Sequence, residues 1–358
     1  MVQLLTAEGQ RVTNDEFAFE GSTEDLVGYL RDMTLARRTD AEATALQRHG
    51  ELGLWTPLIG QEAAQVGSAH AVRGADMVFP TYREHAVAQV LGIGIEQILA
   101  LFRGSDAGAW DHIDKFRNYT LVIGAQTLHA VGYAMGMQFD GVVGNPDDAD
   151  NSAVIVYHGD GASSQGDVNE SYIFAATYNA PVVFFVQNNQ WAISEPIGLQ
   201  SRIPLFERAR GFGFPGVQVD GNDVLAVKAV SDWAMRRARR GDGPAFIEAY
   251  TYRMGAHTTS DDPTKYRGGD EEEAWRGRDP IARLTTYLRR EGAVDDVWFD
   301  ALDQEADDLG ADVRASIKRL HDLSMDEIFA GVYAEPTVAL DAQRREYAEY
   351  VTSFVEGA

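Results

Sequence analysis

The most constraining feature of the sequence is a pair of buried-strand patterns in the middle of the chain. Residues 154–157 and 181–186 are short, apolar and rich in β-branched side chains, which is typical of strands buried on both faces. The residues between them, 168–178, predict a helix. Strand, helix and strand in this order form a βαβ unit, so the two strands are expected to be parallel in one sheet.

Residues that can bind a ligand follow both strands, at the edge where open parallel sheets bind their ligands. Gly159-Asp160-Gly161 follows the first strand, and Asn188-Asn189 follows the second. Glycine lets the backbone turn sharply and approach a ligand, because it tolerates positive φ. A carboxylate, an amide oxygen and backbone carbonyls suit Mg²⁺ or Ca²⁺ when phosphate oxygens complete the coordination. The pattern predicts a site for a cation and a phosphorylated ligand, with two plain turns as the alternative.

Helix and strand patterns keep alternating along the chain and predict one doubly wound α/β domain with a mostly parallel sheet. Ser22 and Asp25 form a weak capping box for a long helix that Gly50 ends. Further strands are expected at 77–80, 217–219 and 245–252, helices at 61–73, 125–139, 223–240, 280–290 and 295–320, and a charged loop at 253–275. We expect an N-terminal extension (1–24), the main domain (25–323) and a partly helical C-terminal arm (324–358).

Composition excludes several classes of protein. The chain of 358 residues has no cysteine, which excludes disulfides, thiolate zinc sites and a cysteine nucleophile. Lys and Arg total 31 against 55 Asp and Glu, and this net charge of −24 disfavours binding to nucleic acid. Apolar runs are too short for a bilayer and the first residues lack the pattern of a signal peptide, so we expect a cytoplasmic protein without membrane contact.

Residues 211–216, GFGFPG, match the spacing of a dinucleotide-binding fingerprint but not its context. The segment follows a charged helical pattern rather than a strand, contains a proline and leads into a strand rather than a helix. A fingerprint needs the reverse order, so a nicotinamide-dependent dehydrogenase is not expected.

Over residues 30–288 the sequence resembles the alpha subunits of thiamin-diphosphate-dependent 2-oxo acid dehydrogenases, the decarboxylating components of multienzyme complexes. Six ordered segments carry the resemblance: 60–63 (GQEA), 79–85 (FPTYREH), 123–126 (IGAQ), the pair 159–161 and 188–189, 219–223 (VDGND) and 252–263. The resemblance implies the thiamin-diphosphate-binding fold, with thiamin diphosphate and Mg²⁺ as cofactors. It also implies oxidative decarboxylation of a 2-oxo acid.

The resemblance implies roles for individual residues. Asp160, Asn189 and the backbone carbonyl of Trp191 would bind the metal. Contacts to the cofactor would come from Tyr82, Arg83, Ile123, Asp160, Gly161, Ala162, Asn189, Arg253 and His257. His257 would also assist the chemistry, as an imidazole that titrates near neutrality, and His85 is a weaker catalytic candidate. His112 is another candidate for the cofactor channel, whereas His129 is expected to pack within its helix.

Such alpha subunits hold only half of an active site. The resemblance implies a heterotetramer of two alpha and two beta chains, and a lipoyl-bearing acyltransferase component that accepts the acyl group. Residues 252–255 and 259–262 favour branched-chain substrates of the 3-methyl-2-oxobutanoate type. Pyruvate and acetoin are the alternative substrates, and a non-catalytic relative that kept the fold is the alternative from another class.

Overall fold

A computed structural model describes residues 1–105 and 115–355, so His112 lies outside the described residues. Within them, the central sheet has the order β1-β2-β3-β7-β6, and its paired strands are all parallel. The strands are β1 (Met77–Phe79), β2 (Val154–Gly159), β3 (Val182–Asn188), β6 (Gly216–Asp220) and β7 (Ala245–Tyr250). Helix α6 (Gly166–Thr177) connects β2 to its parallel neighbour β3, which confirms the predicted βαβ unit.

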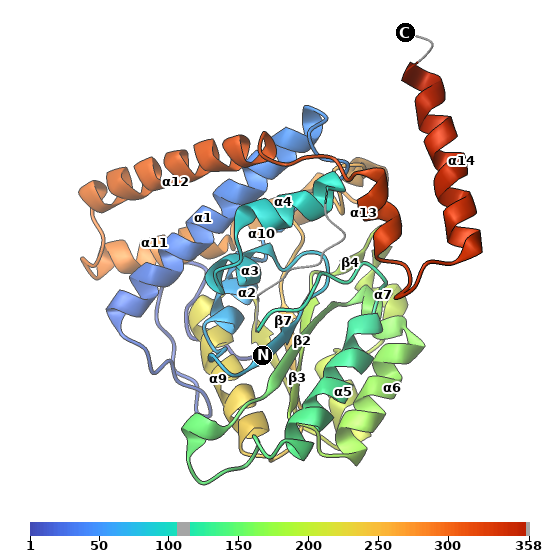
Figure 1. The fold of residues 1–358 in the computed structure, drawn as a ribbon. Coiled ribbons are helices and arrows are strands. Elements are labelled where there is room, and N and C mark those ends of the chain that lie inside the picture. Colours follow the sequence, from blue (N-terminus) through green and yellow to red (C-terminus); the bar gives the residue numbers. More distant parts are fainter. Residues whose placement is uncertain (106–114, 356–358) are drawn as a thin grey trace.

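Helices cover both faces of this sheet (Figure 1). Alternate residues along β2 and β3 belong to two different hydrophobic clusters, because successive side chains of a strand point to opposite faces. Ile155 and Val183 face α2 (Glu62–Ala69) and α9 (Val224–Arg239), whereas Val156 and Phe184 face α5 (Ala125–Phe139) and α6. The side chains of both clusters are almost fully buried, so the sheet is covered on each side. The predicted doubly wound fold is therefore confirmed.

An outer layer of helices packs over the α2 side of the sheet. Helix α1 (Thr23–Arg48) begins with the predicted capping box of Ser22 and Asp25, and it contacts α11 (Pro280–Arg290) and α12 (Asp296–Ile317). Helix α3 (His85–Val90) and helix α4 (Ile95–Arg103) lie in a stretch for which the sequence pattern predicted no element.

Several predicted boundaries differ from the structure. Helix α2 ends at Ala69 rather than residue 73, and the turn that follows is held by the Asp76 side chain, which accepts from the Arg73 N–H. The expected loop 253–275 includes helix α10 (Gly269–Arg276). Helix α8 (Phe206–Phe212) ends at Gly213 with a φ of 95°, so residues 211–216 form a helix end leading into a strand. They carry no dinucleotide fingerprint.

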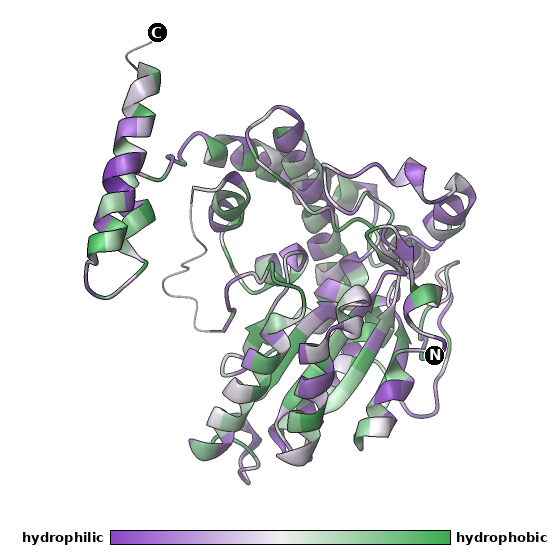
Figure 2. Cartoon of the chain, turned by 90° about the vertical axis from the view of Figure 1, so that its right-hand side faces the viewer, coloured by the Kyte–Doolittle hydropathy of each residue, from purple (hydrophilic) through white to green (hydrophobic). Residues whose placement is uncertain are grey.

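The ends of the described chain differ in how they attach to the domain. Val2 forms a parallel bridge with Val219 of β6, and the Asp223 carboxylate accepts from the N–H groups of Leu4 and Leu5 at 2.6 Å each. Helix α14 (Val338–Val355), reached through α13 (Met325–Ala330), stands away from the body of the domain (Figure 1). Hydrophobic and hydrophilic positions alternate along it (Figure 2). The division of the chain at residues 24 and 323 stays a prediction.

Candidate active site

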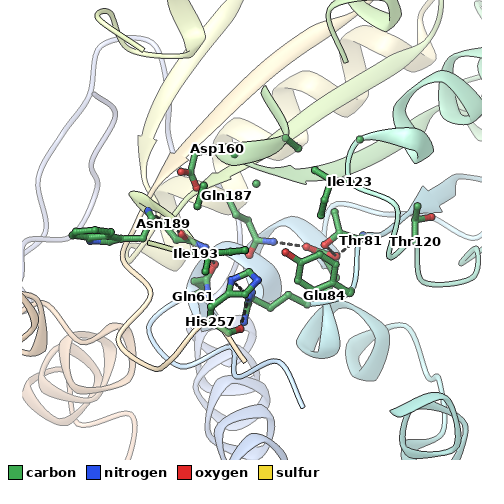
Figure 3. A pocket seen from close by; sticks show the side chains of 18 of the residues that line it. Gln61, Thr81, Glu84, Thr120, Ile123, Asp160, Gln187, Asn189, Ile193 and His257 are labelled. Carbon is green, nitrogen blue, oxygen red and sulfur yellow. Dashed lines mark hydrogen bonds between the residues drawn. The ribbon is translucent and has the colours of Figure 1, made fainter. Parts of the chain in front are cut away.

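A pocket lies beyond the carboxyl ends of β2 and β3 (Figure 3). It is lined by nine of the predicted site residues: Tyr82, Arg83, Ile123, Asp160, Gly161, Ala162, Asn189, Trp191 and His257. These residues come from distant parts of the sequence, and the parallel sheet brings them together where its strands end. His85 and Arg253, which were also predicted, do not line the pocket.

Asp160 and Asn189 come from the ends of neighbouring strands and lie on the same side of the pocket (Figure 3). Burial raises the pKa of Asp160 to about 6, against the opposing effects of its own backbone N–H and the charge of Arg253. Gln200 Nε2 donates to the Asp160 carboxylate at 3.3 Å. A bound cation would favour the charged form of this carboxylate, because opposite charge lowers the pKa of an acid.

The two asparagines that end β3 have different environments. Asn188 donates from Nδ2 to Glu248 Oε1 at 2.6 Å, so its side chain is used within the protein. Asn189 lines the pocket, and its Nδ2 donates to Gln61 Oε1 at 3.1 Å. The backbone N–H of Trp191 donates to Asn189 Oδ1 at 3.3 Å, which identifies this atom as the amide oxygen. Asn189 is therefore the asparagine of the pair that can present an oxygen to a ligand.

Arg253 supports the loop that follows β3 from outside the pocket lining. Gln190 and Ile193 in this loop have positive φ values of 72° and 54°, which non-glycine residues adopt only when the surroundings enforce them. Arg253 donates from Nη1 to the Trp191 carbonyl and from Nη2 to the Ile193 carbonyl, each at 2.8 Å. Arg253 thus holds this loop in place, and its contact with the cofactor stays a prediction.

Arg83 and His257 form the side of the pocket that offers hydrogen-bond donors. The Arg83 guanidinium is buried and donates to the carbonyls of Pro57 at 2.6 Å and His257 at 2.9 Å. His257 Nδ1 lies 3.3 Å from Arg83 Nη2 and 3.4 Å from Arg253 Nη1. Burial and the charges of these two arginines lower the pKa of His257 to about 3.

This arrangement determines the protonation state of His257. Both neighbours of Nδ1 are guanidinium groups, which only donate hydrogen bonds, so Nδ1 must act as the acceptor. The neutral ring therefore carries its proton on Nε2. At neutral pH, His257 offers the pocket a neutral hydrogen-bond donor rather than an imidazolium.

A buried network beside the pocket was not predicted from the sequence. Gln187 Nε2 donates to Glu84 Oε1 at 2.6 Å, and Glu84 Oε2 accepts from the N–H and the hydroxyl of Thr81. Gln65 Nε2 donates to Gln187 Oε1 and to the Arg83 carbonyl. Burial raises the pKa of Glu84. The network fixes the segment that carries Tyr82 and Arg83.

Other pocket residues were also missed as individual candidates: Gln61, Thr81, Glu84, Thr120 and Gln126. Gln61, Thr81, Glu84 and Gln126 stand inside the segments on which the family resemblance rests. Their position in those segments was the one signal that could have identified them.

His85 lies outside the pocket lining, in an aromatic cluster. Its ring stacks on Trp55 with centroids 4.2 Å apart, and its Nδ1 and Nε2 lie 3.0 Å from the Tyr119 hydroxyl and the Thr56 carbonyl. Burial lowers the pKa of His85 to about 3. The geometry favours a structural role over the predicted catalytic one.

The prediction for His129 was wrong, because this residue is exposed on α5 rather than packed.

The residues present fit a phosphorylated ligand with a divalent cation. Asp160 supplies a carboxylate, Asn189 an amide oxygen and Trp191 a carbonyl, which is a donor set of hard oxygens. Among the described residues no group of three or more His, Cys, Asp and Glu side chains could hold a metal, but a site with one carboxylate does not require such a group. At Gly161 an added Cβ would lie 2.7 Å from Ala192 Cβ, so glycine is needed for this close approach.

A parallel sheet with an oxygen-lined and cationic pocket at its strand ends defines an α/β enzyme that binds a phosphorylated cofactor. The family model described as dehydrogenase E1 component matches residues 30–325, and the chain belongs to this family. This result confirms the resemblance inferred from the sequence.

Individual relatives show which members of this family the chain is similar to. The chain is 43% identical over 352 residues to the 3-methyl-2-oxobutanoate dehydrogenase subunit alpha of Mycobacterium tuberculosis (strain ATCC 25618 / H37Rv), which covers 96% of this chain and 92% of that protein. It is 36% identical over 349 residues to the pyruvate dehydrogenase E1 component subunit alpha of Acholeplasma laidlawii, covering 95% and 98%. The corresponding subunit of Staphylococcus aureus (strain COL) is 37% identical over 324 residues, covering 89% and 84%. The chain is thus similar to alpha subunits of both kinds.

Among residues 1–105 and 115–355, every helix is too short or too polar to cross a lipid bilayer.

Proposed function

We propose that the chain is the alpha subunit of a thiamin-diphosphate- and Mg²⁺-dependent enzyme that oxidatively decarboxylates branched-chain 2-oxo acids and passes the acyl group to a lipoyl-bearing acyltransferase component. One observation carries the proposal. In a chain of the dehydrogenase E1 component family, Asp160, Asn189, Arg83 and His257 line one pocket at the strand ends.

Different residues would hold the two parts of the cofactor. Asp160, Asn189 Oδ1 and the Trp191 carbonyl would bind Mg²⁺, and Gly161 and Ala162 would lie against the diphosphate. Thiamin diphosphate supplies the carbon nucleophile and the electron sink that decarboxylation of a 2-oxo acid requires. Ile123, on the opposite side of the pocket from Asp160 (Figure 3), would pack against the organic part of the cofactor.

Arg83 and His257 would act on anionic and carbonyl oxygens. The guanidinium of Arg83 is held rigidly by two backbone carbonyls, and a fixed cation suits a phosphate or carboxylate. His257 holds its proton on Nε2 and can donate it as a hydrogen bond to a substrate oxygen without adding a positive charge. Such a preorganised donor stabilises negative charge that develops on that oxygen.

The mouth of the pocket is apolar and exposed, which supports a partner subunit there. Ile123 and Ile193 line the pocket and are 41% and 54% exposed, and Leu121 and Val122, which precede Ile123 in the chain, are 57% and 72% exposed. Exposed apolar side chains that gather in one place usually mark an interaction site. We propose that a beta subunit covers this rim in a heterotetramer of two alpha and two beta chains.

Substrate choice within the class is supported by similarity. The Mycobacterium tuberculosis relative, at 43% identity, is named for 3-methyl-2-oxobutanoate, whereas the pyruvate dehydrogenase relatives are 36% and 37% identical. Branched-chain 2-oxo acids are therefore the proposed substrates, and pyruvate is the second candidate.

The test is a turnover assay on the chain co-expressed with its beta subunit. Release of CO₂ from 3-methyl-2-oxobutanoate and from pyruvate would be measured with an artificial electron acceptor. We expect release that depends on thiamin diphosphate and Mg²⁺, with the higher kcat/KM for the branched-chain acid. A higher value for pyruvate contradicts only the proposed substrate, and no release from either acid contradicts the proposed activity.

A further inference from the structure

Gln61, the residue before α2, lines the pocket and is buried. One of the two polar atoms of its side-chain amide has no hydrogen-bond partner in the described part of the chain. The exposed fraction of Gln61 is 0%, and its Oε1 accepts from Asn189 Nδ2 at 3.1 Å. Its Nε2 is buried and has no hydrogen-bond partner within residues 1–105 and 115–355. Buried polar groups nearly always have partners, because they lose their hydrogen bonds with water.

The orientation of the Gln61 amide follows from its neighbours. The Trp191 N–H donates to Asn189 Oδ1, so the Asn189 atom that faces Gln61 is the donor Nδ2. Turning the Gln61 amide over would place two NH₂ groups against each other. The unpartnered atom is therefore a donor, and it needs an acceptor from outside the chain.

Gln65, one turn later in α2, provides an internal comparison. Its Nε2 donates to the Arg83 carbonyl and to Gln187 Oε1, and its Oε1 accepts from the Ala86 N–H. Both ends of this buried amide are used within the protein. The hydrogen bonds of the Gln65 side chain are thus satisfied within the described chain, whereas those of the Gln61 side chain are not.

We propose that Gln61 is a ligand-binding residue whose Nε2 donates to an anionic oxygen of the bound cofactor, while its Oε1 holds Asn189 with Oδ1 directed to the metal. The inference rests on the proposed function. The polar neighbours support an anionic acceptor, because Arg83 and His257, which line the same pocket, are also donors. A residue that orients a metal ligand commonly affects affinity as strongly as a direct ligand does.

The test uses the full-length chain co-expressed with its beta subunit. Binding of thiamin diphosphate, and separately of inorganic pyrophosphate, would be followed at saturating Mg²⁺ through tryptophan fluorescence, because Trp191 lines the pocket. Gln61→Glu keeps an acceptor for Asn189 but removes the donor, so we expect Kd to rise roughly tenfold or more for both probes. Gln61→Met removes the donor without adding charge and should give a loss in the same direction.

Controls separate binding from folding. Gln138→Glu adds the same charge at a half-buried position of α5 outside the pocket lining and should leave Kd unchanged. Far-UV circular dichroism checks that each variant is folded, and a variant with an altered melting temperature but unchanged Kd overturns the inference.

If wild type binds both probes and the Gln61 variants bind equally well, the inference fails and the proposed function stands. If wild type binds pyrophosphate but not thiamin diphosphate, the proposed cofactor fails, and the pyrophosphate data alone decide the role of Gln61. Binding of neither probe by wild type overturns both.

Discussion

Buried histidines link the stability of this chain to pH. The pKa values of His85 and His257 are lowered to about 3, and that of His158 to about 4, mainly because burial disfavours the charged ring. His158 is held by the Tyr172 hydroxyl on Nε2, 2.9 Å away. Below a pH of about 6.5 an unfolded histidine binds a proton that these folded ones do not, so the free energy of unfolding falls as pH decreases.

We predict that His85→Gln reduces this acid sensitivity. Each such histidine should remove about 2 kcal/mol of stability between pH 7 and pH 5, because only the unfolded chain is protonated in this window. Urea unfolding at the two pH values measures the difference for wild type and variant. His129→Gln, at an exposed position of α5, is the matched control. An equal acid loss in wild type and His85→Gln would contradict the prediction.

Residues at strand ends could be predicted from the sequence, and those positioned by tertiary packing could not. Asp160 and Asn189 directly follow recognisable strands, so the edge at which they meet was predictable. Gln61 reaches the pocket because the start of α2 packs beside the end of β3, and local patterns do not encode that contact. Arg253 has the chemistry of an anion ligand, but both of its Nη groups donate to loop carbonyls, those of Trp191 and Ile193.

At the scale of elements, the turn after β2 and the short hairpin after β3 depend on each other. The hairpin consists of β4 (Trp191–Ala192) and β5 (Glu195–Pro196), and it lies close to Gly161. A Cβ at Gly161 would lie 2.7 Å from Ala192 Cβ, whereas a Cβ at Gly159 would meet no atom within 4 Å. Gly159 and Gly161 do not have positive φ, so the backbone conformation does not disfavour alanine at either position. The space around the added Cβ therefore decides the effect of a substitution.

We predict that Gly161→Ala destabilises the ligand-free protein by about 1–3 kcal/mol, because the hairpin must move to accommodate the methyl group. The matched variant Gly159→Ala should change stability by much less. Chemical denaturation of both variants without cofactor measures the two effects. Equal stability of the two variants would show that the hairpin does not need a glycine at position 161.

The strands of the sheet and the helices that pack on it were predicted well, because the hydrophobic periodicity of each is visible in its own short stretch of sequence. Strands β2 and β3 and helices α5 and α9 appear within one or two residues of expectation. Two of the misjudged stretches are polar or lie at a turn, namely α10 and the end of α2. Their boundaries depend on tertiary contacts such as the Asp76 side chain at the turn after α2.

At the scale of the whole molecule, helix α14 carries an apolar stripe that the described chain covers only in part, where Tyr347 contacts Phe329. Tyr347, Tyr350 and Phe354 follow at helical spacing and are 40%, 59% and 64% exposed. A helix with an apolar stripe normally buries it against another element. The stripe and the apolar rim of the pocket together support an assembly in which another subunit covers both.

We predict that Tyr350→Asp weakens association with the beta subunit by roughly tenfold, since aromatic anchors dominate interface energetics. Gln343→Asp, an exposed polar position of the same helix, should have little effect. Size-exclusion chromatography with light scattering would compare the fraction of heterotetramer for the two variants at several concentrations. Unchanged assembly of Tyr350→Asp would show that this stripe is not part of the interface.

We propose that Asp160 and Asn189 hold a divalent cation against a diphosphate. Calorimetric titration of thiamin diphosphate into the complex with its beta subunit, with and without Mg²⁺, tests it most directly. Wild type is expected to bind only in the presence of Mg²⁺, and Asp160→Ala is expected to show no binding, because the carboxylate is the one anionic ligand of the proposed site. Binding by Asp160→Ala with the affinity and Mg²⁺ dependence of wild type would show that Asp160 is not a ligand of the cation.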